Sequence, residues 1–365
     1  MMRILFLPST PLNILVSAAL ACHLRQRQGV DFQAQIWLID QKNLENNPYS
    51  KALENWVESP FQCIKILPGI AKGRAKLAER KQNFARMQQG LAEFQPNIIA
   101  TGSDRRIEFQ YAMQSMERQG AKPQGWYLDD GLYSYAGRPY HPIKDGINSF
   151  IKKLAYGFWW QEPKTIGASN WIQQAWLFKP EGAIDALQAK QHSTLASVLF
   201  TAPEVRVFSQ SVLSAFNYDG QVLSHLNAIL IFPHPNDMAK MAGYEAKVKK
   251  LVSILIEAGF HIGIKYHPRQ VQADFLNLTQ HEQVVLIPAQ IAFEFILPFI
   301  QADTLVVADV CTALMTAKWL GSDLDIAAVL DQQDVYQLQF VGVMEKLDIK
   351  RYLSYDELLN ELKDK

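Results

Sequence analysis

The sequence is short of cysteine, of net charge and of long apolar runs. Three cysteines, Cys22, Cys63 and Cys311, are odd in number, widely spaced and without a C-x-x-C pair, so neither a disulfide framework nor a structural zinc site is predicted. The 36 basic and 36 acidic residues leave a formal net charge of zero, which provides no global field to recruit nucleic acid. We therefore expect the protein to be located in the reducing cytoplasm, and any anionic ligand to be bound by residues close to it and not by the field of the whole protein.

No apolar run reaches the roughly 18 residues that a membrane span needs. The apolar N-terminal stretch MMRILFLPSTPLNILVSAAL is interrupted by Pro8, Ser9, Thr10 and Pro11, which indicates a strand, a turn and a helix instead of a signal peptide. With 365 residues, 48% of them hydrophobic, the chain is long enough to bury the cores of two domains.

Short apolar runs alternate with longer amphipathic stretches in both halves of the chain. In the first half, predicted strands RILFLP, QAQIWLID, QCIKIL, PNIIATG and QGWYLDDG are separated by predicted helices from Pro11, near 45–57, over 75–94 and from Asp104. From Leu226 the strands are NAILIFPHP, HIGIKYHP, QVVLIP, DTLVVADV and LDIAAVL, and the helices are 240–258, 291–301 and 312–320. This alternation predicts α/β domains, each a parallel sheet covered by helices.

Two such halves predict two Rossmann-like domains that face a central cleft. We place an N-terminal domain over 1–157, an interdomain segment over 158–220, a C-terminal domain over 221–350 and a C-terminal helix over 351–365. The middle segment is rich in Trp, Pro and Gly and is poorly periodic, as a linker would be. In open parallel sheets ligands bind at the carboxyl ends of strands, so the informative residues should directly follow strands.

Polar residues follow three predicted strands of the second half. His267-Pro268 follows GIKY, and an imidazole beside a phosphate can become a cation and donate a proton. Thr312, after Cys311, stands where a helix N-cap belongs and where an anion is favoured, although a cap without a ligand is the equal alternative. Glu294 falls in the first turn of a predicted helix, where it favours the dipole or accepts hydrogen bonds from a ribose.

The dipeptide H-P occurs three times, at His141, His234 and His267, and only the last two follow convincing strands. In the first half, Asp129 and Asp130 stand at a strand end with a glycine after them. Adjacent carboxylates repel, so one of them can have the raised proton affinity of a general base, whereas an Asp-Gly turn is the bland alternative.

Other features allow two interpretations each. Ser103, Asp104 and Arg105 follow a strand and either cap a helix or contact an acceptor on the first domain. The basic run KGRAKLAERKQNFAR is a solvated helix face or a contact with anionic lipid, and the aromatic YGFWW packs inside the protein or lies at a membrane surface. Asp323 and Asp325 form a D-x-D string at the start of a strand, the wrong end for a ligand, so we predict no metal site there.

In order and spacing, these motifs resemble those of bacterial GT-B sialyltransferases, especially the lipooligosaccharide sialyltransferases of glycosyltransferase family 52 and the capsular polysialyltransferases. That family carries D/E-D/E-G, H-P and Ser/Thr motifs, which are matched here by Asp129-Asp130-Gly131, His267-Pro268 and Cys311-Thr312. The opening STPLNILVSAAL, with Thr10, is similar to the family's first β-loop-α unit, and Phe293-Glu294 to its nucleotide-contacting segment. Cys311 departs from the pattern, because relatives often have two adjacent hydroxyl residues.

The resemblance implies a GT-B fold and an inverting, metal-independent transfer of a sialic-acid-like nonulosonic acid. The donor would be CMP-activated, and the acceptor a hydroxyl of a bacterial surface glycan, in a capsule or lipooligosaccharide. Asp130 or Asp129 would take the acceptor proton, with a preference for Asp130. His267, Pro268, Glu294, Cys311 and Thr312 would hold the donor, and Thr10, Ser103, Asp104 and Arg105 would lie on the acceptor side.

No cofactor and no metal is expected, because the CMP-sugar is a substrate. The expected partners are that donor and a glycan or glycolipid acceptor, without nucleic acid. The expected location is the cytoplasm, and a peripheral association with the inner face of the cytoplasmic membrane stays open, as does the oligomeric state. Sialic, legionaminic and pseudaminic acid are equally compatible with the motifs. Two alternatives stay open: a GT-B enzyme that uses a UDP-sugar, as a transferase or a 2-epimerase, and a catalytically silent nucleotide- or glycan-binding protein.

Overall fold

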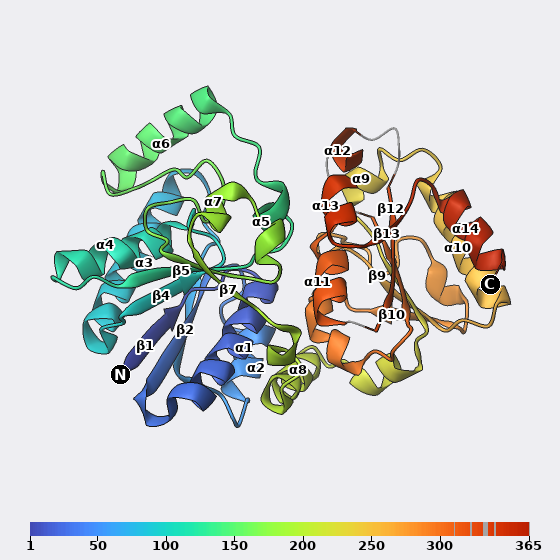
Figure 1. Ribbon diagram of the computed structural model, residues 1–365, viewed down its shortest axis with the longest axis horizontal. Helices are drawn as coiled ribbons and strands as arrows, with labels where there is room; N and C mark the ends of the chain where they lie inside the picture. The colour runs from blue at the N-terminus through green and yellow to red at the C-terminus, as the bar shows by residue number, and fades with distance from the viewer. Residues whose placement is uncertain (310, 322, 331–334, 339–340, 365) are drawn as a thin grey trace. The chain divides into compact units, whose positions relative to one another are not determined.

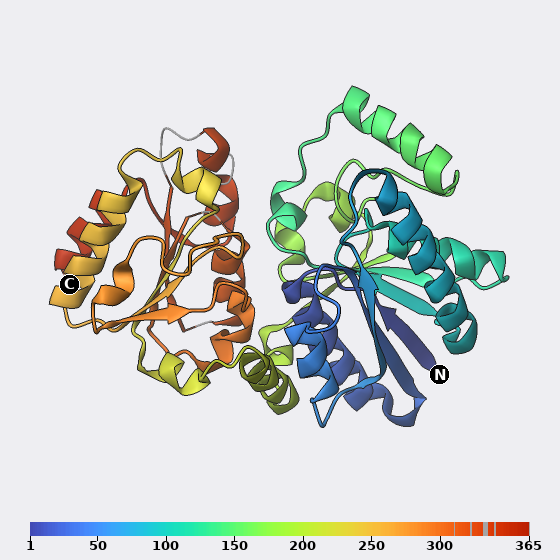
Figure 2. The same ribbon diagram turned by 180° about the vertical axis from the view of Figure 1, so that it is seen from behind.

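The structure is a computed structural model, and it describes residues 1–309, 311–321, 323–330, 335–338 and 341–364 (Figure 1). The chain divides into two compact units, unit 1 over Met1–Ser211 and unit 2 over Val212–Lys365. Each unit is a parallel β-sheet with helices on both faces (Figures 1 and 2), so the predicted α/β class is confirmed.

Unit 1 contains a seven-stranded sheet in the order β3-β2-β1-β4-β5-β6-β7. Its strands are β1 Met2–Phe6, β2 Phe32–Gln41, β3 Phe61–Pro68, β4 Ile98–Thr101, β5 Gln124–Leu128, β6 Gln174–Leu177 and β7 Gln191–Thr194. In β1, the side chains of Ile4, Leu5 and Phe6 have no exposed surface. A strand of this kind is apolar on both faces because helices cover both sides of a parallel sheet.

The helices of unit 1 lie on the two faces of this sheet, α1 and α2 on one and α3 and α4 on the other (Figures 1 and 2). They are α1 Pro11–Gln28, α2 Pro48–Glu54, α3 Gly73–Phe94, α4 Ile107–Arg118, α5 Tyr133–Ala136, α6 Pro142–Tyr156, α7 Asp185–Gln188 and α8 Pro203–Ala215. Helix α1 begins where the sequence predicts, because Thr10 caps it by accepting the Asn13 backbone N–H and Pro11 occupies its first position.

Unit 2 contains a six-stranded sheet in the order β10-β9-β8-β11-β12-β13. Its strands are β8 Ala228–Ile231, β9 Ile262–Lys265, β10 Val284–Ile287, β11 Leu305–Ala308, β12 Asp325–Val329 and β13 Lys350–Tyr352. Its helices are α9 Pro235–Met238, α10 Tyr244–Glu257, α11 Thr312–Leu320, α12 Val335–Leu338, α13 Val341–Lys346 and α14 Tyr355–Asp364. Helices α10 and α14 cover one face and α11 and α13 the other (Figures 1 and 2).

The prediction of an interdomain segment over 158–220 is wrong. Strand β6 pairs with β5, and β7 pairs with β6, so this segment completes the first sheet, and the division between the units falls at Ser211. Both strands are short, and in β7 Ser193 is partly buried while the other three residues are exposed. Four residues are too few for a clear periodicity, and β7, at the edge of the sheet, needs no continuous apolar run, so apolar periodicity missed both strands.

The predicted helix over 291–301 is also wrong. The structure has two short 3-10 turns there, Phe293–Phe295 and Leu297–Phe299. Pro298 lies within the predicted helix and has no backbone N–H to continue it. The predicted C-terminal helix over 351–365 is shorter, since β13 extends to Tyr352 and α14 begins at Tyr355.

Among the residues that the structure describes, no helix is both long enough and apolar enough to cross a bilayer.

Candidate functional site

The carboxyl end of the unit 1 sheet brings the loops after β1 and β5 together. The Thr10 hydroxyl donates a hydrogen bond to Asp130 Oδ1 at 3.2 Å, and Asn13 Nδ2 donates to the Asp129 carbonyl oxygen at 3.3 Å. β1 lies beside β4, which lies beside β5, so these residues meet although Thr10 and Asp130 are 120 positions apart. The edge at which parallel α/β sheets bind ligands therefore carries an acid, a hydroxyl and an amide.

Asp129 is a buried structural acid. Its side chain has no exposed surface and accepts hydrogen bonds from the Gly131 N–H at 2.9 Å, the Ser134 hydroxyl at 2.8 Å, the Phe178 N–H at 3.1 Å and the Tyr135 hydroxyl. Both carboxyl oxygens are thus occupied by groups that hold the loop after β5 against the end of β6. The assignment of Asp129 as a candidate base is corrected, because a substrate hydroxyl has no access to it.

Asp130 is the more accessible of the two acids, although burial raises the pKa of both carboxyl groups. Its side chain is partly exposed, and the left-handed backbone of Gly131, with φ at 90°, turns the chain directly after it. Burial raises the pKa of Asp130 to about 7. The positive charge of Arg106 and the hydrogen bonds from Thr10 and Asn13 lower the pKa, but by less than burial raises it. A carboxyl group that exchanges its proton near neutral pH is suited to general base catalysis.

Two residues of this site, Asn13 and Arg106, were missed by the sequence predictions. Asn13 is buried, and a Cβ at Gly102 would stand 1.6 Å from its Oδ1, so the glycine after β4 leaves room for the amide. Arg106 pairs with Asp40, so its charge is held near Asp130. Asn13 lies in STPLN and Arg106 in TGSDRR, and each segment follows a strand. Their positions after strand ends could therefore have indicated them as site residues.

Of the other residues predicted on the acceptor side, Asp104 has a structural role. Asp104 has no exposed surface and accepts from the backbone N–H groups of Gly167 at 2.9 Å and Ser169 at 2.8 Å, so its assignment as an acceptor contact is corrected. Because the Asp104 carboxylate accepts these two N–H groups, it does not cap a helix, and α4 begins three residues later, at Ile107. Ser103 lies in the turn before α4, and Arg105, partly exposed, pairs with Glu162; both stay predictions.

The correction for Asp104 can be tested by replacing it with Asn. An amide has one acceptor oxygen where the carboxylate uses two, so one buried backbone N–H should lose its partner, and the free energy of unfolding should fall by about 1–3 kcal/mol. Turnover per folded molecule and KM for the acceptor should not change. A raised KM with unaltered thermal stability would return Asp104 to the acceptor side.

In unit 2, two histidines lie together at the carboxyl ends of the neighbouring strands β8 and β9. The ring centroids of His234 and His267 are 4.9 Å apart and their planes meet at 62°. Each Nδ1 accepts a backbone N–H two residues further on, from Asn236 for His234 and from Arg269 for His267, both at 3.1 Å. His234-Pro235 is visible in the sequence as a repeated H-P dipeptide after a strand, but no role was predicted for it.

His267 is partly buried, and its environment favours the neutral ring. Burial lowers its pKa, and the charges of His234, Arg269 and Lys265 lower it further. Because Nδ1 accepts the Arg269 N–H, the proton of the neutral ring belongs on Nε2. A bound anion would meet an N–H donor at Nε2 and would itself favour protonation of the ring. Pro268 is exposed in the turn that follows.

Glu294 lies close to a buried lysine. It is almost fully buried, accepts the Thr316 hydroxyl at 3.0 Å, and has a pKa raised by burial. Lys265, at the end of β9, is buried as well, and burial lowers its pKa to about 8 against the opposing charge of Glu294. Lys265 Nζ donates to the Ala289 carbonyl oxygen at 3.0 Å. The role of Glu294 toward a ribose stays a prediction.

The amino end of α11 differs in one detail from its prediction. Cys311, not Thr312, holds the N-cap position, and its side chain makes no capping hydrogen bond. Burial raises the pKa of the Cys311 thiol to about 12, so the thiol stays neutral. Asp309, at the end of β11, has a pKa raised to about 7 by burial and accepts the Tyr244 hydroxyl at 3.3 Å. Val310, between them, lies outside the described residues.

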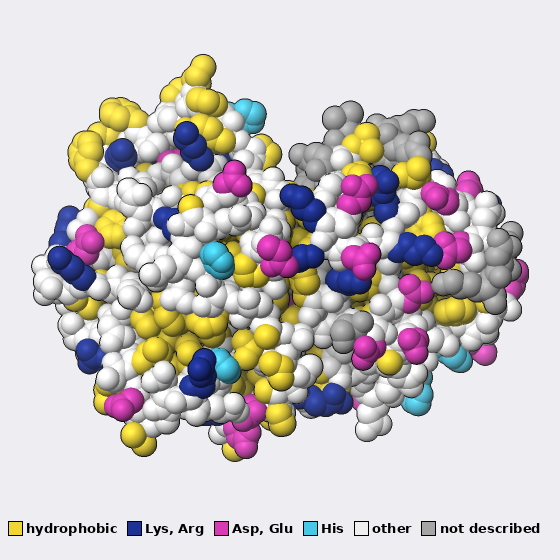
Figure 3. All heavy atoms as spheres, viewed as in Figure 1, with side chains coloured by type: hydrophobic (Ala, Val, Ile, Leu, Met, Phe, Trp, Pro, Cys, Tyr) yellow, Lys and Arg dark blue, Asp and Glu magenta, His cyan; other side chains and the backbone are white. Residues whose placement is uncertain are grey.

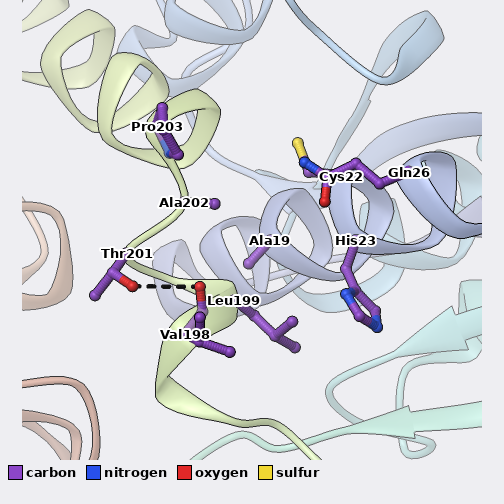
Figure 4. A pocket seen from close by; sticks show the side chains of 9 residues that line it. All are labelled: Ala19, Cys22, His23, Gln26, Val198, Leu199, Thr201, Ala202 and Pro203. Atoms are coloured by element: carbon purple, nitrogen blue, oxygen red, sulfur yellow. Dashed lines mark hydrogen bonds between the residues drawn. The ribbon is translucent and has the colours of Figure 1, made fainter.

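A cavity of about 330 Å³ in unit 1 lies elsewhere (Figure 4). It is lined by Ala19, Cys22, His23 and Gln26 of α1 and by Val198, Leu199, Thr201, Ala202 and Pro203. These α1 residues begin at Ala19, in the middle of the helix, whereas Thr10 stands at its start, and the cavity contains none of the predicted site residues. Burial raises the pKa of the Cys22 thiol to about 12, which leaves no reactive thiolate there.

Within the described ranges, no three His, Cys, Asp or Glu side chains are grouped as metal ligands would be. The expected independence of metal stays a prediction.

No protein-family model and no characterised protein sequence matches this chain. Solved structures do. The α-2,3-sialyltransferase of Photobacterium phosphoreum is similar at a TM-score of 0.57 and 10% identity, over 96% of this chain and 98% of that one. The UDP-GlcNAc 2-epimerase of Neisseria meningitidis is similar at 0.55 and 13%, over 100% and 91%. The GT-B domain of the Photobacterium damselae sialyltransferase is similar at 0.53 and 14%, over 96% and 98%.

At identities this low the likeness concerns the fold alone. It agrees with two parallel-sheet α/β units in one chain, while membership of glycosyltransferase family 52 stays a prediction. The fold of this protein is GT-B.

Proposed function

We propose that this protein is an inverting glycosyltransferase that moves a sialic-acid-like nonulosonic acid from CMP to a hydroxyl of a bacterial surface glycan. The observation that carries the proposal is the contrast between two adjacent acids. Asp129 is saturated with buried hydrogen bonds, whereas Asp130 is partly exposed and its pKa is raised to about 7 by burial. This is the arrangement that a general base for a sugar hydroxyl requires.

On unit 1, Asp130 takes the proton of the attacking hydroxyl. The Thr10 hydroxyl orients the carboxylate through its hydrogen bond to Oδ1, and the charge of Arg106 keeps the deprotonated form available at neutral pH. Without Arg106 the pKa of Asp130 would be higher still, because burial alone favours the protonated acid.

On unit 2, His267 Nε2 donates to the phosphate of the departing CMP. Cleavage of the sugar–phosphate bond leaves negative charge on that phosphate, and a preorganised N–H donor stabilises the charge as it forms. His234 lies against His267, and the amino end of α11 at Thr312 favours a nearby anion. We include a capsule or lipooligosaccharide acceptor in the proposal because the motifs resemble those of enzymes that build these glycans.

A second candidate is a GT-B enzyme that acts on a UDP-sugar, as a transferase or a 2-epimerase. The observation that favours it is the equally good structural likeness to the 2-epimerase of Neisseria meningitidis, which was solved bound to UDP-GlcNAc. A third candidate is a nucleotide- or glycan-binding protein that keeps the fold and has no activity.

Nucleotide binding separates these candidates. We expect CMP to raise the melting temperature of the protein more than UDP, GDP or ADP at equal concentration, because CMP is the nucleotide of the proposed donor and the ligand with the higher affinity for the folded protein stabilises it more. The rise should be the same in EDTA and in magnesium. Turnover of CMP-nonulosonates with glycan acceptors would then be measured.

Other outcomes have distinct meanings. A response to UDP alone would contradict the proposal and favour the second candidate. Binding of CMP without any turnover of CMP-linked sugars would favour the binding protein. Loss of the CMP response in EDTA would overturn metal independence while leaving the donor class intact.

A further inference from the structure

Helix α6 has its apolar face directed away from the protein. Its residues Ile143, Ile147, Phe150 and Leu154 recur at the spacing of one helix face, and their side chains are 81%, 56%, 58% and 65% exposed. Ile151 beside them is 56% exposed. Helices on the surface of a globular protein normally turn such a stripe toward the core. Figure 3 shows the hydrophobic side chains gathered along the outer side of this helix.

The opposite, polar face of α6 attaches the helix to unit 1. Asp145 is buried and accepts from Arg138 Nη2 at 2.8 Å on both oxygens. Lys152 Nζ pairs with Glu162 at 2.8 Å and lies 4.2 Å from the centroid of the Trp160 ring. These polar contacts, each with a buried carboxylate, fix the rotation of the helix, so they determine that the apolar stripe faces outward.

The charge around the stripe is positive. The helix has one acid, Asp145, and it faces inward, whereas Lys144 and Lys153 lie on the two borders of the stripe. At the start of α3, the exposed Lys76 adds a positive charge on this side of unit 1, since it lines the same pocket as Ile151 and Lys152. An apolar stripe bordered by lysines is typical of helices that lie in the surface of an anionic bilayer.

Aromatic residues stand at both ends of the helix. Tyr140 precedes it and is 36% exposed, and Phe158 follows it and is 78% exposed. Aromatic side chains favour the boundary between headgroups and acyl chains. A second copy of this chain fits the stripe less well, because its lysines would face the same lysines of the partner.

We propose that α6 docks unit 1 onto the surface of a bilayer that contains anionic phospholipid. The apolar stripe enters the acyl boundary, and the lysines contact lipid phosphates. The proposal does not depend on the nucleotide or the sugar that the protein uses. It centres the membrane contact on α6. Of the two segments considered in the sequence, the exposed Lys76 of the basic run and the exposed Phe158 of YGFWW stay part of it, whereas Arg80 and Trp160 are buried.

Vesicle flotation of the full chain tests the proposal, with vesicles of phosphatidylcholine alone or mixed with phosphatidylglycerol. We expect binding to the mixed vesicles. The double variant Ile147→Asp with Phe150→Asp should lose binding by at least about tenfold, because two charges enter the acyl boundary. Lys144→Glu with Lys153→Glu should lose about tenfold on mixed vesicles.

The matched control is Val57→Asp with Val271→Asp, which changes two scattered side chains that are 94% and 100% exposed. This variant should bind vesicles like the wild type, and all variants should keep the wild-type melting temperature and nucleotide response. Equal partition of the α6 variants and the wild type, or no partition of the wild type, would overturn the proposal. So would a wild-type dimer that dissociates on the Ile147 and Phe150 changes without any binding to vesicles.

Discussion

Replacing Asp130 by Asn is expected to lower kcat/KM for glycosyl transfer by about 10²–10⁴-fold, the usual contribution of a general base. The amide still accepts the Thr10 hydrogen bond, so the site should keep its shape. In the wild type, the acidic limb of the pH dependence of kcat/KM should lie near pH 7, where burial places the pKa of Asp130. The residual activity of the variant should lack this limb.

The same substitution should not destabilise the fold at alkaline pH. The folded pKa of Asp130, about 7, is raised above the ordinary value of about 4, so its contribution to stability is complete at acid pH and is lost as the pH rises through 7. The amide of the Asp130→Asn variant does not titrate and escapes this loss. We therefore expect the difference in melting temperature, variant minus wild type, to increase between pH 5 and pH 8.

Asp129→Asn is the matched control and should behave in the opposite way. An amide nitrogen in place of one carboxyl oxygen would face the Phe178 N–H or other donors, so the free energy of unfolding should fall by at least about 2 kcal/mol. If Asp130→Asn keeps near-normal turnover, or if Asp129→Asn alone abolishes turnover while the melting temperature is unchanged, the assignment of the base is wrong.

The second large effect is expected from His267→Ala. Loss of the N–H donor at the departing phosphate should reduce kcat by about 10²–10³-fold, as for other donors that stabilise charge in the transition state. The melting temperature should change little, because the ring is partly exposed and its Nδ1 accepts a hydrogen bond from the backbone N–H of the exposed Arg269. Steady-state kinetics with a CMP-sugar and thermal unfolding are the two measurements.

His141→Ala provides a control with the same H-P dipeptide. His141 is exposed and precedes α6 in unit 1, so its removal should leave kcat and KM for a soluble acceptor unchanged. His234→Ala should give a loss between the two, since His234 contacts His267 and helps to set its pKa. Near-normal turnover of His267→Ala would remove this residue from the mechanism.

The positions of the candidate residues could be predicted from the sequence to a large extent. Asp130, His267 and Thr312 follow strands whose apolar runs are visible in the sequence, and parallel sheets present such positions at one edge. His234 had the same signal in its H-P dipeptide. Strands β6 and β7 had no such signal, because each has only four residues and β7, at the edge of the sheet, is mostly exposed.

The different chemistry of Asp129 and Asp130 could not be predicted, because they are identical neighbours in the chain. Their roles depend on burial and on donors such as Ser134, Phe178 and Thr10, which only the folded chain brings to them. Asp104 shows the same limit, since the N–H groups of Gly167 and Ser169 that occupy it are more than 60 positions away.

The sequence by itself determined the alternation of strands and helices, the α/β class and the placing of polar residues after strands, because these depend on local periodicity. Tertiary structure alone decided which acid is accessible, where unit 1 ends and which way α6 faces. The spacing of Ile143, Ile147, Phe150 and Leu154 shows that α6 has an apolar face, but the direction of that face depends on how Asp145 and Lys152 attach the helix. Local periodicity defines a stripe, and only contacts with distant residues determine whether it is buried.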